Sequence, residues 1–267
     1  MDVERAAENR DVSIRPAATV LLVHDDPEGL KVLMLRRTTK AAFAGGMYVF
    51  PGGRVDPGDG DMEIESFCEG LDDCAASARL GIDQGGLSYW VAAVRETFEE
   101  AGVIVGRRRD GSHVELSAEE RRAVHAGELS MAELCRRHDL VLDLGRVPYV
   151  AHWVTPRGEI RRFDTRFFLA AVPGNQDALH DEMETVESRW LRPASALAEM
   201  AAGSFMMLPP TIASLEWLST FDDVESALDA ARALPSPPRI EPKLRFDDVG
   251  NVTGVAMPGE ADYDELD

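Results

Sequence analysis

Basic residues are scarce in this 267-residue sequence, which has 28 Lys and Arg against 48 Asp and Glu and a formal net charge of −20. Such an acidic chain is a poor partner for a nucleic-acid backbone or an anionic membrane surface, so we predict neither. Cysteine is also scarce: Cys68, Cys74 and Cys135 are odd in number and lack the spacing of a metal site. This pattern is typical of a reduced compartment, and we predict a cytoplasmic protein.

Long apolar runs are missing as well. No segment approaches the roughly 20 apolar residues that a membrane-spanning helix needs, and residues 1–10 are charged rather than signal-like. The length suits one large domain with additions. We expect a frayed lead at 1–13, a catalytic domain at 14–234, and a C-terminal part at 235–267 made of a linker, a hairpin and an acidic, disordered tail.

What the sequence does contain is a predicted helix at 91–101 with three glutamates on one face. Glu96, Glu99 and Glu100 are spaced i, i+3 and i+4, so their carboxylates project in the same direction. A second, apolar stripe at helical spacing would pack on a sheet. Gly102 ends the helix, and residues 103–105 are predicted to form a strand. In isolation, the acidic face would be interpreted as a solvated surface.

The segment Phe50-Pro51-Gly52-Gly53 changes that interpretation. Its glycines form a turn without side chains, which lets a phosphate or a metal-bound oxygen approach the backbone closely. Carboxylate oxygens at this density suit Mg²⁺ or Mn²⁺. Arg95 is placed to pair with Glu99 one turn later and to steady it.

These residues resemble the signature of Nudix hydrolases, Gly-x5-Glu-x7-Arg-Glu-U-x-Glu-Glu-x-Gly-U, where U is bulky and apolar. Gly53 opens the pattern, and its second half is complete from Arg95 to Val103 except at one position. Asp59 stands where the first Glu is expected, and Thr97 replaces the first apolar residue. Between Asp59 and Arg95 lie 35 residues rather than seven, an insertion of 28.

The long insertion makes the chain similar to one branch of that family, the mammalian peroxisomal coenzyme A diphosphatases. The segment 153–165 and the Trp190-Leu191 pair support this likeness, which covers about residues 14–220. The insertion at 60–87 is interpreted either as a lid over the pocket or as a surface excursion. Capping boxes predict two helices, 118–126 and 131–138, within a helical cap at 115–140.

The resemblance implies a Nudix α/β/α sandwich with a mixed sheet, to which we add helical additions and a C-terminal hairpin. Glu96, Glu99 and Glu100 would hold Mg²⁺ or Mn²⁺, and Glu99 or Glu184 would take a proton from the attacking water. Arg95 would have an orienting role. The candidate substrate-binding residues are Gly52, Gly53, Arg37, Arg161 and Arg162, with ion pairing to the surplus acids as the alternative for the arginines.

The implied substrate is a small nucleoside diphosphate conjugate. Coenzyme A or an acyl-coenzyme A comes first, and ADP-ribose or NADH is the alternative. Residues 33–53 partly match a coenzyme A motif, but Ala41 and Ala44 stand where it has Leu and His. A non-catalytic Nudix-fold regulator is a third possibility, disfavoured by the intact glutamates. A homodimer is expected by analogy with many Nudix proteins.

Overall fold

The computed structural model describes residues 12–39, 44–112, 114–172 and 185–266. Its main sheet has eight strands, in the order β10-β2-β1-β9-β8-β11, with β3 paired to β2 and β4 to β1. The strands are β1 (Ile14–Asp26), β2 (Gly29–Arg37), β3 (Tyr48–Val49), β4 (Gly52–Arg54), β8 (Tyr149–Val154), β9 (Arg162–Ala171), β10 (Thr185–Leu191) and β11 (Arg239–Ile240). Two consecutive pairs, β1 with β2 and β8 with β9, form antiparallel hairpins.

The sheet is mixed because its two longest strands run parallel. β1 pairs with β9 in parallel over ten residues, from Ile14 opposite Arg162 to Val23 opposite Ala171. The other pairs of this sheet are antiparallel, except β8 with β11. β4 pairs with β1 on the side away from β9, so the Gly-Gly segment lies beside the middle of β1.

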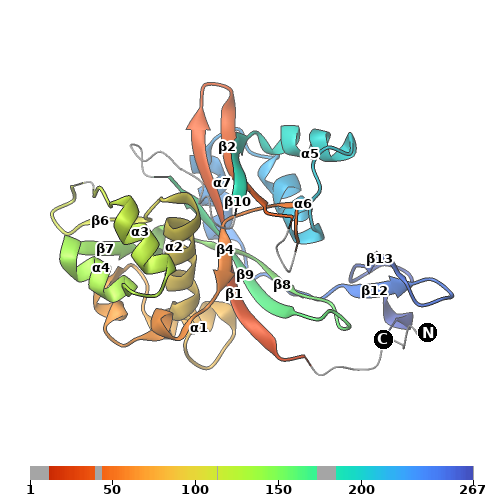
Figure 1. Ribbon diagram of the computed structural model, residues 1–267, viewed down its shortest axis with the longest axis horizontal. Coiled ribbons are helices and arrows are strands. Elements are labelled where there is room, and N and C mark those ends of the chain that lie inside the picture. Colours follow the sequence, from red (N-terminus) through yellow and green to blue (C-terminus); the bar gives the residue numbers. More distant parts are fainter. Residues whose placement is uncertain (1–11, 40–43, 113, 173–184, 267) are drawn as a thin grey trace.

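Both faces of the sheet are covered, which makes a sandwich (Figure 1). Alternate residues of a strand point to opposite faces. Ala18, Val20 and Leu22 pack toward α2 (Leu87–Ala101) in one core, whereas Leu21 and Val23 pack into a second core. The second core lies under α5 (Pro193–Ala201), α6 (Pro209–Leu218) and α7 (Val224–Ala233). This confirms the predicted α/β fold with helical additions.

The insertion and the region after α2 form one lobe beside α2. It contains α1 (Asp73–Leu80), α3 (Ala118–His125) and α4 (Met131–His138), close to the predicted helices. A small sheet joins β5 (Cys68–Glu69) from the insertion to β7 (Leu140–Asp143) and β6 (Gly106–Arg108). The strand predicted at 103–105 is wrong: these residues are buried core, and the strand begins at Gly106. An apolar run alone does not distinguish a strand from buried irregular chain.

The C-terminal part forms the expected hairpin, β12 (Lys243–Phe246) and β13 (Val252–Ala256), next to the tip of β8 and β9 (Figure 1). The tail was predicted to be disordered, but Asp262 binds the guanidinium of Arg245 through both carboxylate oxygens, and a short 3₁₀ turn follows. The sequence prediction overlooked this ion pair between the hairpin and the tail. In the described ranges, no helix has the length and apolar character needed to cross a bilayer.

Candidate active site

Helix α2 carries the predicted acidic cluster, but the cluster is buried rather than solvated. Glu96, Glu99 and Glu100 are 9%, 7% and 4% exposed, and Asp59 from the start of the insertion is 1% exposed. The helix begins at Leu87, four residues earlier than predicted, and ends at Gly102 in the left-handed conformation. Its opposite face anchors it in the core through Trp90, Val94 and Phe98.

Arg95 is the centre of this cluster. Its Nε and Nη2 atoms donate to the two carboxylate oxygens of Asp59 at 2.8 and 2.9 Å. Its Nη1 atom donates to Glu96 at 2.9 Å and to Glu99 at 3.1 Å, which includes the pairing expected from the spacing. Asp59 thus takes over an anchoring function at the position of the first Glu, because a bidentate carboxylate fixes the plane of a guanidinium.

Thr97, the second departure from the signature, is compatible with the core. Its side chain is fully buried, and its hydroxyl donates to the carbonyl of Ala93 at 2.7 Å. A buried hydroxyl that bonds the preceding turn of its own helix leaves no unsatisfied polar atom.

The Gly-Gly segment lies against the acidic face. The backbone amide of Gly52 donates to Glu100 at 2.9 Å, which holds that carboxylate at the edge of the sheet. A Cβ atom at Gly52 would be 2.5 Å from the carbonyl oxygen of Ala18 on β1. A Cβ atom at Gly53 would be 2.3 Å from Glu96 Oε1. Both glycines are therefore required by close approach, one to the backbone and one to a candidate metal ligand.

We expect Gly53→Ala to lower hydrolytic activity by about 10- to 100-fold, because the new methyl group displaces the Glu96 carboxylate, as mutations next to metal ligands do. Gly58→Ala is the matched control, since a Cβ atom there meets nothing within 4 Å. Steady-state rates and circular dichroism of both variants test this. Equal activity of the two folded variants would contradict a role for the space at Gly53.

The residues of the cluster fit a divalent cation. Four carboxylates are buried together, and three of them contact the guanidinium of Arg95. Burial raises the pKa of Glu96 well above its usual value, with Glu100 and Glu99 adding to the effect and Arg95 opposing it. Burial likewise raises the pKa of Glu99. A bound cation would relieve this cost, and hard oxygen donors suit Mg²⁺ or Mn²⁺. In the described ranges no three acidic, His or Cys side chains already form a coordination shell, and Arg95 occupies oxygens of Glu96 and Glu99.

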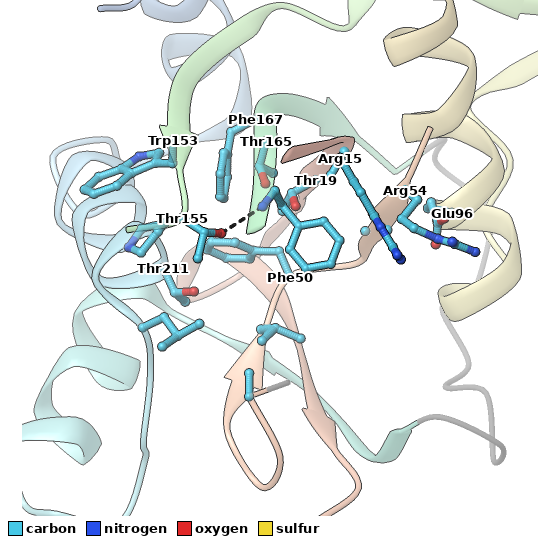
Figure 2. Close-up of a pocket in the computed structure, with 18 of the residues that line it drawn as sticks. Arg15, Thr19, Phe50, Arg54, Glu96, Trp153, Thr155, Thr165, Phe167 and Thr211 are labelled. Atoms are coloured by element: carbon cyan, nitrogen blue, oxygen red, sulfur yellow. Dashed lines mark hydrogen bonds between the residues drawn. The ribbon is translucent and has the colours of Figure 1, made fainter. Parts of the chain in front are cut away.

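A cavity of about 940 Å³ opens from this cluster, within the size range of small-molecule sites. Glu96 lies at one end of the cavity (Figure 2), and Arg95 and Gly53 adjoin it there. Trp153 lies at the other end, with Phe50 and Phe167 between them. The N-terminal turn of α6 and residues Pro242 and Val255 of the C-terminal part complete the walls.

The structure brings most of the predicted site residues into this cavity. Its lining includes Arg37, Gly52, Gly53, Arg95, Glu96, Glu99, Glu100 and Arg161. Arg162 lies on the other side of the strand: its guanidinium bonds the carbonyl of Thr155 and Glu241 at 2.5 Å, so the ion-pair alternative holds for it. Glu184 lies outside the described residues.

The insertion does not cover the cavity. None of residues 60–87, all of which the structure describes, contributes to its lining. Ile64, Leu71, Ala76 and Leu80 instead pack into the core on the α2 side. The lid interpretation is therefore wrong for this structure, because the apolar residues of the insertion are used to extend that core.

Three cavity residues were missed in the sequence analysis. Arg54 directly follows Gly53, and Arg15 alternates with Ala17 and Thr19 on β1, which is a readable signal once the strand is known to face the pocket. His125, at the end of α3, had been given no chemistry. Its Nδ1 lies 3.5 Å from Glu99 Oε2, a contact that only the folded lobe creates.

The fold and the acidic site are those of a Nudix hydrolase, an enzyme of the pyrophosphohydrolase class, and comparisons with known proteins agree. Residues 82–218 match the family described as the NUDT19 Nudix domain, so the chain belongs to that family. A Nudix hydrolase structure from Alicyclobacillus acidocaldarius is similar with a TM-score of 0.73 and 28% identity, covering 86% of this chain and 100% of that one.

Two curated relatives carry the name acyl-coenzyme A diphosphatase NUDT19. The Gallus gallus protein is 26% identical, covering 79% of this chain and 69% of the relative. The Homo sapiens protein is 27% identical, covering 73% of this chain and 62% of the relative. This chain thus spans about two thirds of the length of these relatives.

Proposed function

We propose that the protein hydrolyses the diphosphate linkage of coenzyme A or an acyl-coenzyme A, giving 3′,5′-ADP and (acyl-)4′-phosphopantetheine. The observation that carries the reaction class is the buried carboxylate cluster of α2 at one end of a cavity that also presents arginines and aromatic rings. The choice of substrate is supported by the names of the relatives.

Different residues of the site have different proposed roles in this reaction. Glu96, Glu99 and Glu100 would hold Mg²⁺ or Mn²⁺, as Nudix hydrolases generally use divalent ions, and such ions offset the charge of the diphosphate and acidify water. Arg95 keeps Glu96 and Glu99 in place through its own anchor on Asp59. Glu99 or Glu184 accepts the proton of the attacking water, the P–O bond to the leaving phosphate breaks, and two phosphate monoesters result.

A product screen tests the proposal. With Mg²⁺ or Mn²⁺ present, we expect coenzyme A and acetyl-coenzyme A to give 3′,5′-ADP by mass spectrometry, and chelation of the metal to stop turnover. The same screen tests four alternative substrates: ADP-ribose, NADH, diadenosine polyphosphates and nucleoside triphosphates. AMP formed from ADP-ribose or NADH, with coenzyme A intact, would keep the reaction class and replace the substrate. Tight binding without turnover of any compound would assign the chain to the regulators.

A further inference from the structure

Three arginines of the cavity contrast with the large acid surplus of the chain. Arg15, Arg54 and Arg161 line the cavity, and in the described ranges their side chains make no ion pair or hydrogen bond. Several arginines outside the cavity pair with acids, as Arg162, Arg189 and Arg245 show. Glu159, the acid of the β8–β9 turn that also lines the cavity, pairs with none of the three. Unneutralised guanidinium groups in a concave site favour an anionic ligand.

The sheet register places the three arginines in a diagonal band across neighbouring chain segments. Arg54 on β4 is opposite Ala17 of β1, and Arg15 lies two residues before Ala17, on the same face. Arg15 in turn is opposite Phe163 of β9, and Arg161 lies two residues before Phe163, again on the same face. The order across the cavity floor is therefore Arg54, Arg15, Arg161. Figure 2 shows Arg54 and Arg15 at the end that holds Glu96.

The three arginines lie at increasing distance from the carboxylates, with Arg54 nearest, Arg15 in the middle and Arg161 farthest. Strands are spaced by about 5 Å, so β1 and β9 lie about 5 and 10 Å from β4, where Gly53 meets Glu96. Arg54 is close enough to serve the diphosphate together with the cation site. Arg15 and Arg161 lie one and two strands farther across the cavity floor.

We propose that Arg15 and Arg161 form a subsite for an additional phosphate monoester, carried by the substrate outside its diphosphate linkage. This deepens the proposed function and rests on it: the substrate class becomes a nucleoside diphosphate conjugate with three phosphates rather than two. ADP-ribose and NADH lack the third phosphate, whereas coenzyme A carries it on the ribose. The subsite is a specificity device and takes no part in bond breaking.

The test is a binding comparison of two nucleotides that differ by one phosphate. Dissociation constants of 3′,5′-ADP and 5′-AMP are measured by calorimetry without divalent ions, so that turnover is not needed. We expect the wild-type protein to bind 3′,5′-ADP about tenfold tighter or more, the size of a charge-assisted contact. Arg15→Gln and Arg161→Gln should each reduce this preference several-fold and leave the dissociation constant of AMP within about twofold of the wild-type value. Arg54→Gln should instead weaken the binding of both nucleotides to the same extent.

Arg157→Gln is the matched control, because Arg157 lies in the same turn as Arg161 but is 78% exposed and contacts Glu241 instead. It removes the same charge and should keep the preference. The proposal is overturned if the wild-type protein has no preference, if the preference survives in both Arg15→Gln and Arg161→Gln, or if Arg157→Gln reduces it equally. If the preference depends on Arg15 and Arg161 while coenzyme A is not hydrolysed, the subsite stands and the proposed substrate fails.

Discussion

Replacing Glu99 by Gln, or Glu100 by Gln, is expected to reduce metal-dependent diphosphate hydrolysis by at least about 100-fold, the lower bound for removing a general base. Each change removes a charge and keeps the shape. The Gln oxygen can still accept the hydrogen bond that Arg95 donates to Glu99, or the one that Gly52 donates to Glu100. The loss would therefore report the missing carboxylate charge rather than a collapsed helix.

The control for this prediction is Glu133→Gln on α4. The Glu133 side chain is exposed, pairs with Arg137 at 2.7 Å and does not line the cavity. Because exposed ion pairs contribute little, the hydrolysis rate of the variant should stay within about twofold of wild type. Rates at saturating Mg²⁺ and a Mn²⁺ binding titration are compared for all variants. Activity within a few-fold of wild type for both Glu99→Gln and Glu100→Gln would refute the assigned chemistry.

The acidic face of α2 was predictable because the information that specifies it is local. Three glutamates at i, i+3 and i+4 share a helix face whatever surrounds the helix, and Gly102 marks its end. The α/β class and the C-terminal hairpin also follow from runs of alternating or apolar residues between turns. The burial of the acidic face could not be read this way, because it depends on β4 and the start of the insertion.

What the sequence could not show are contacts between distant segments. Asp59 and Arg95 are 36 residues apart, and His125 meets Glu99 only because α3 packs beside α2. The arginines illustrate a finer limit. Arg161 and Arg162 are adjacent and chemically alike, yet one lines the cavity and the other pairs with Glu241, since neighbouring residues of a strand face opposite sides.

The sequence of the insertion at 60–87 led to a wrong interpretation as a lid. Its acidic residues and glycines suggested a surface loop that could move over the pocket. However, its few apolar residues are spaced so that they enter the core beside α2, and Asp73 accepts hydrogen bonds from the amides of Gly85 and Leu87. These bonds tie α1 of the insertion to the segment that leads into α2. The insertion therefore packs against α2 and supports it.

Asp59→Asn is the variant with the largest expected effect on stability. Asp59 is almost fully buried, and its two oxygens accept from Arg95, with Oδ2 also accepting from the Asp56 amide at 2.8 Å. An Asn side chain would turn an NH₂ group toward the Arg95 guanidinium. The buried positive charge of Arg95 would then be balanced by Glu96 and Glu99 alone. Removing one partner of a buried ion pair costs about 3 to 5 kcal/mol, which for a chain of this size lowers the Tm by very roughly 6–20 °C.

Asp229→Asn provides the comparison, because Asp229 pairs with Arg232 at 2.7 Å on the exposed face of α7. Its substitution should lower the free energy of unfolding by less than about 1 kcal/mol. Chemical unfolding of both variants measures the difference. Asp59→Asn should also lower activity about 10- to 100-fold at a temperature where it is folded, since Arg95 then no longer holds Glu96 and Glu99 in place. A folded Asp59→Asn variant with wild-type activity would show that Arg95 needs no anchor. In that case the carboxylates of α2 would be positioned by the helix alone, and the departure from Glu at this position would have no functional meaning.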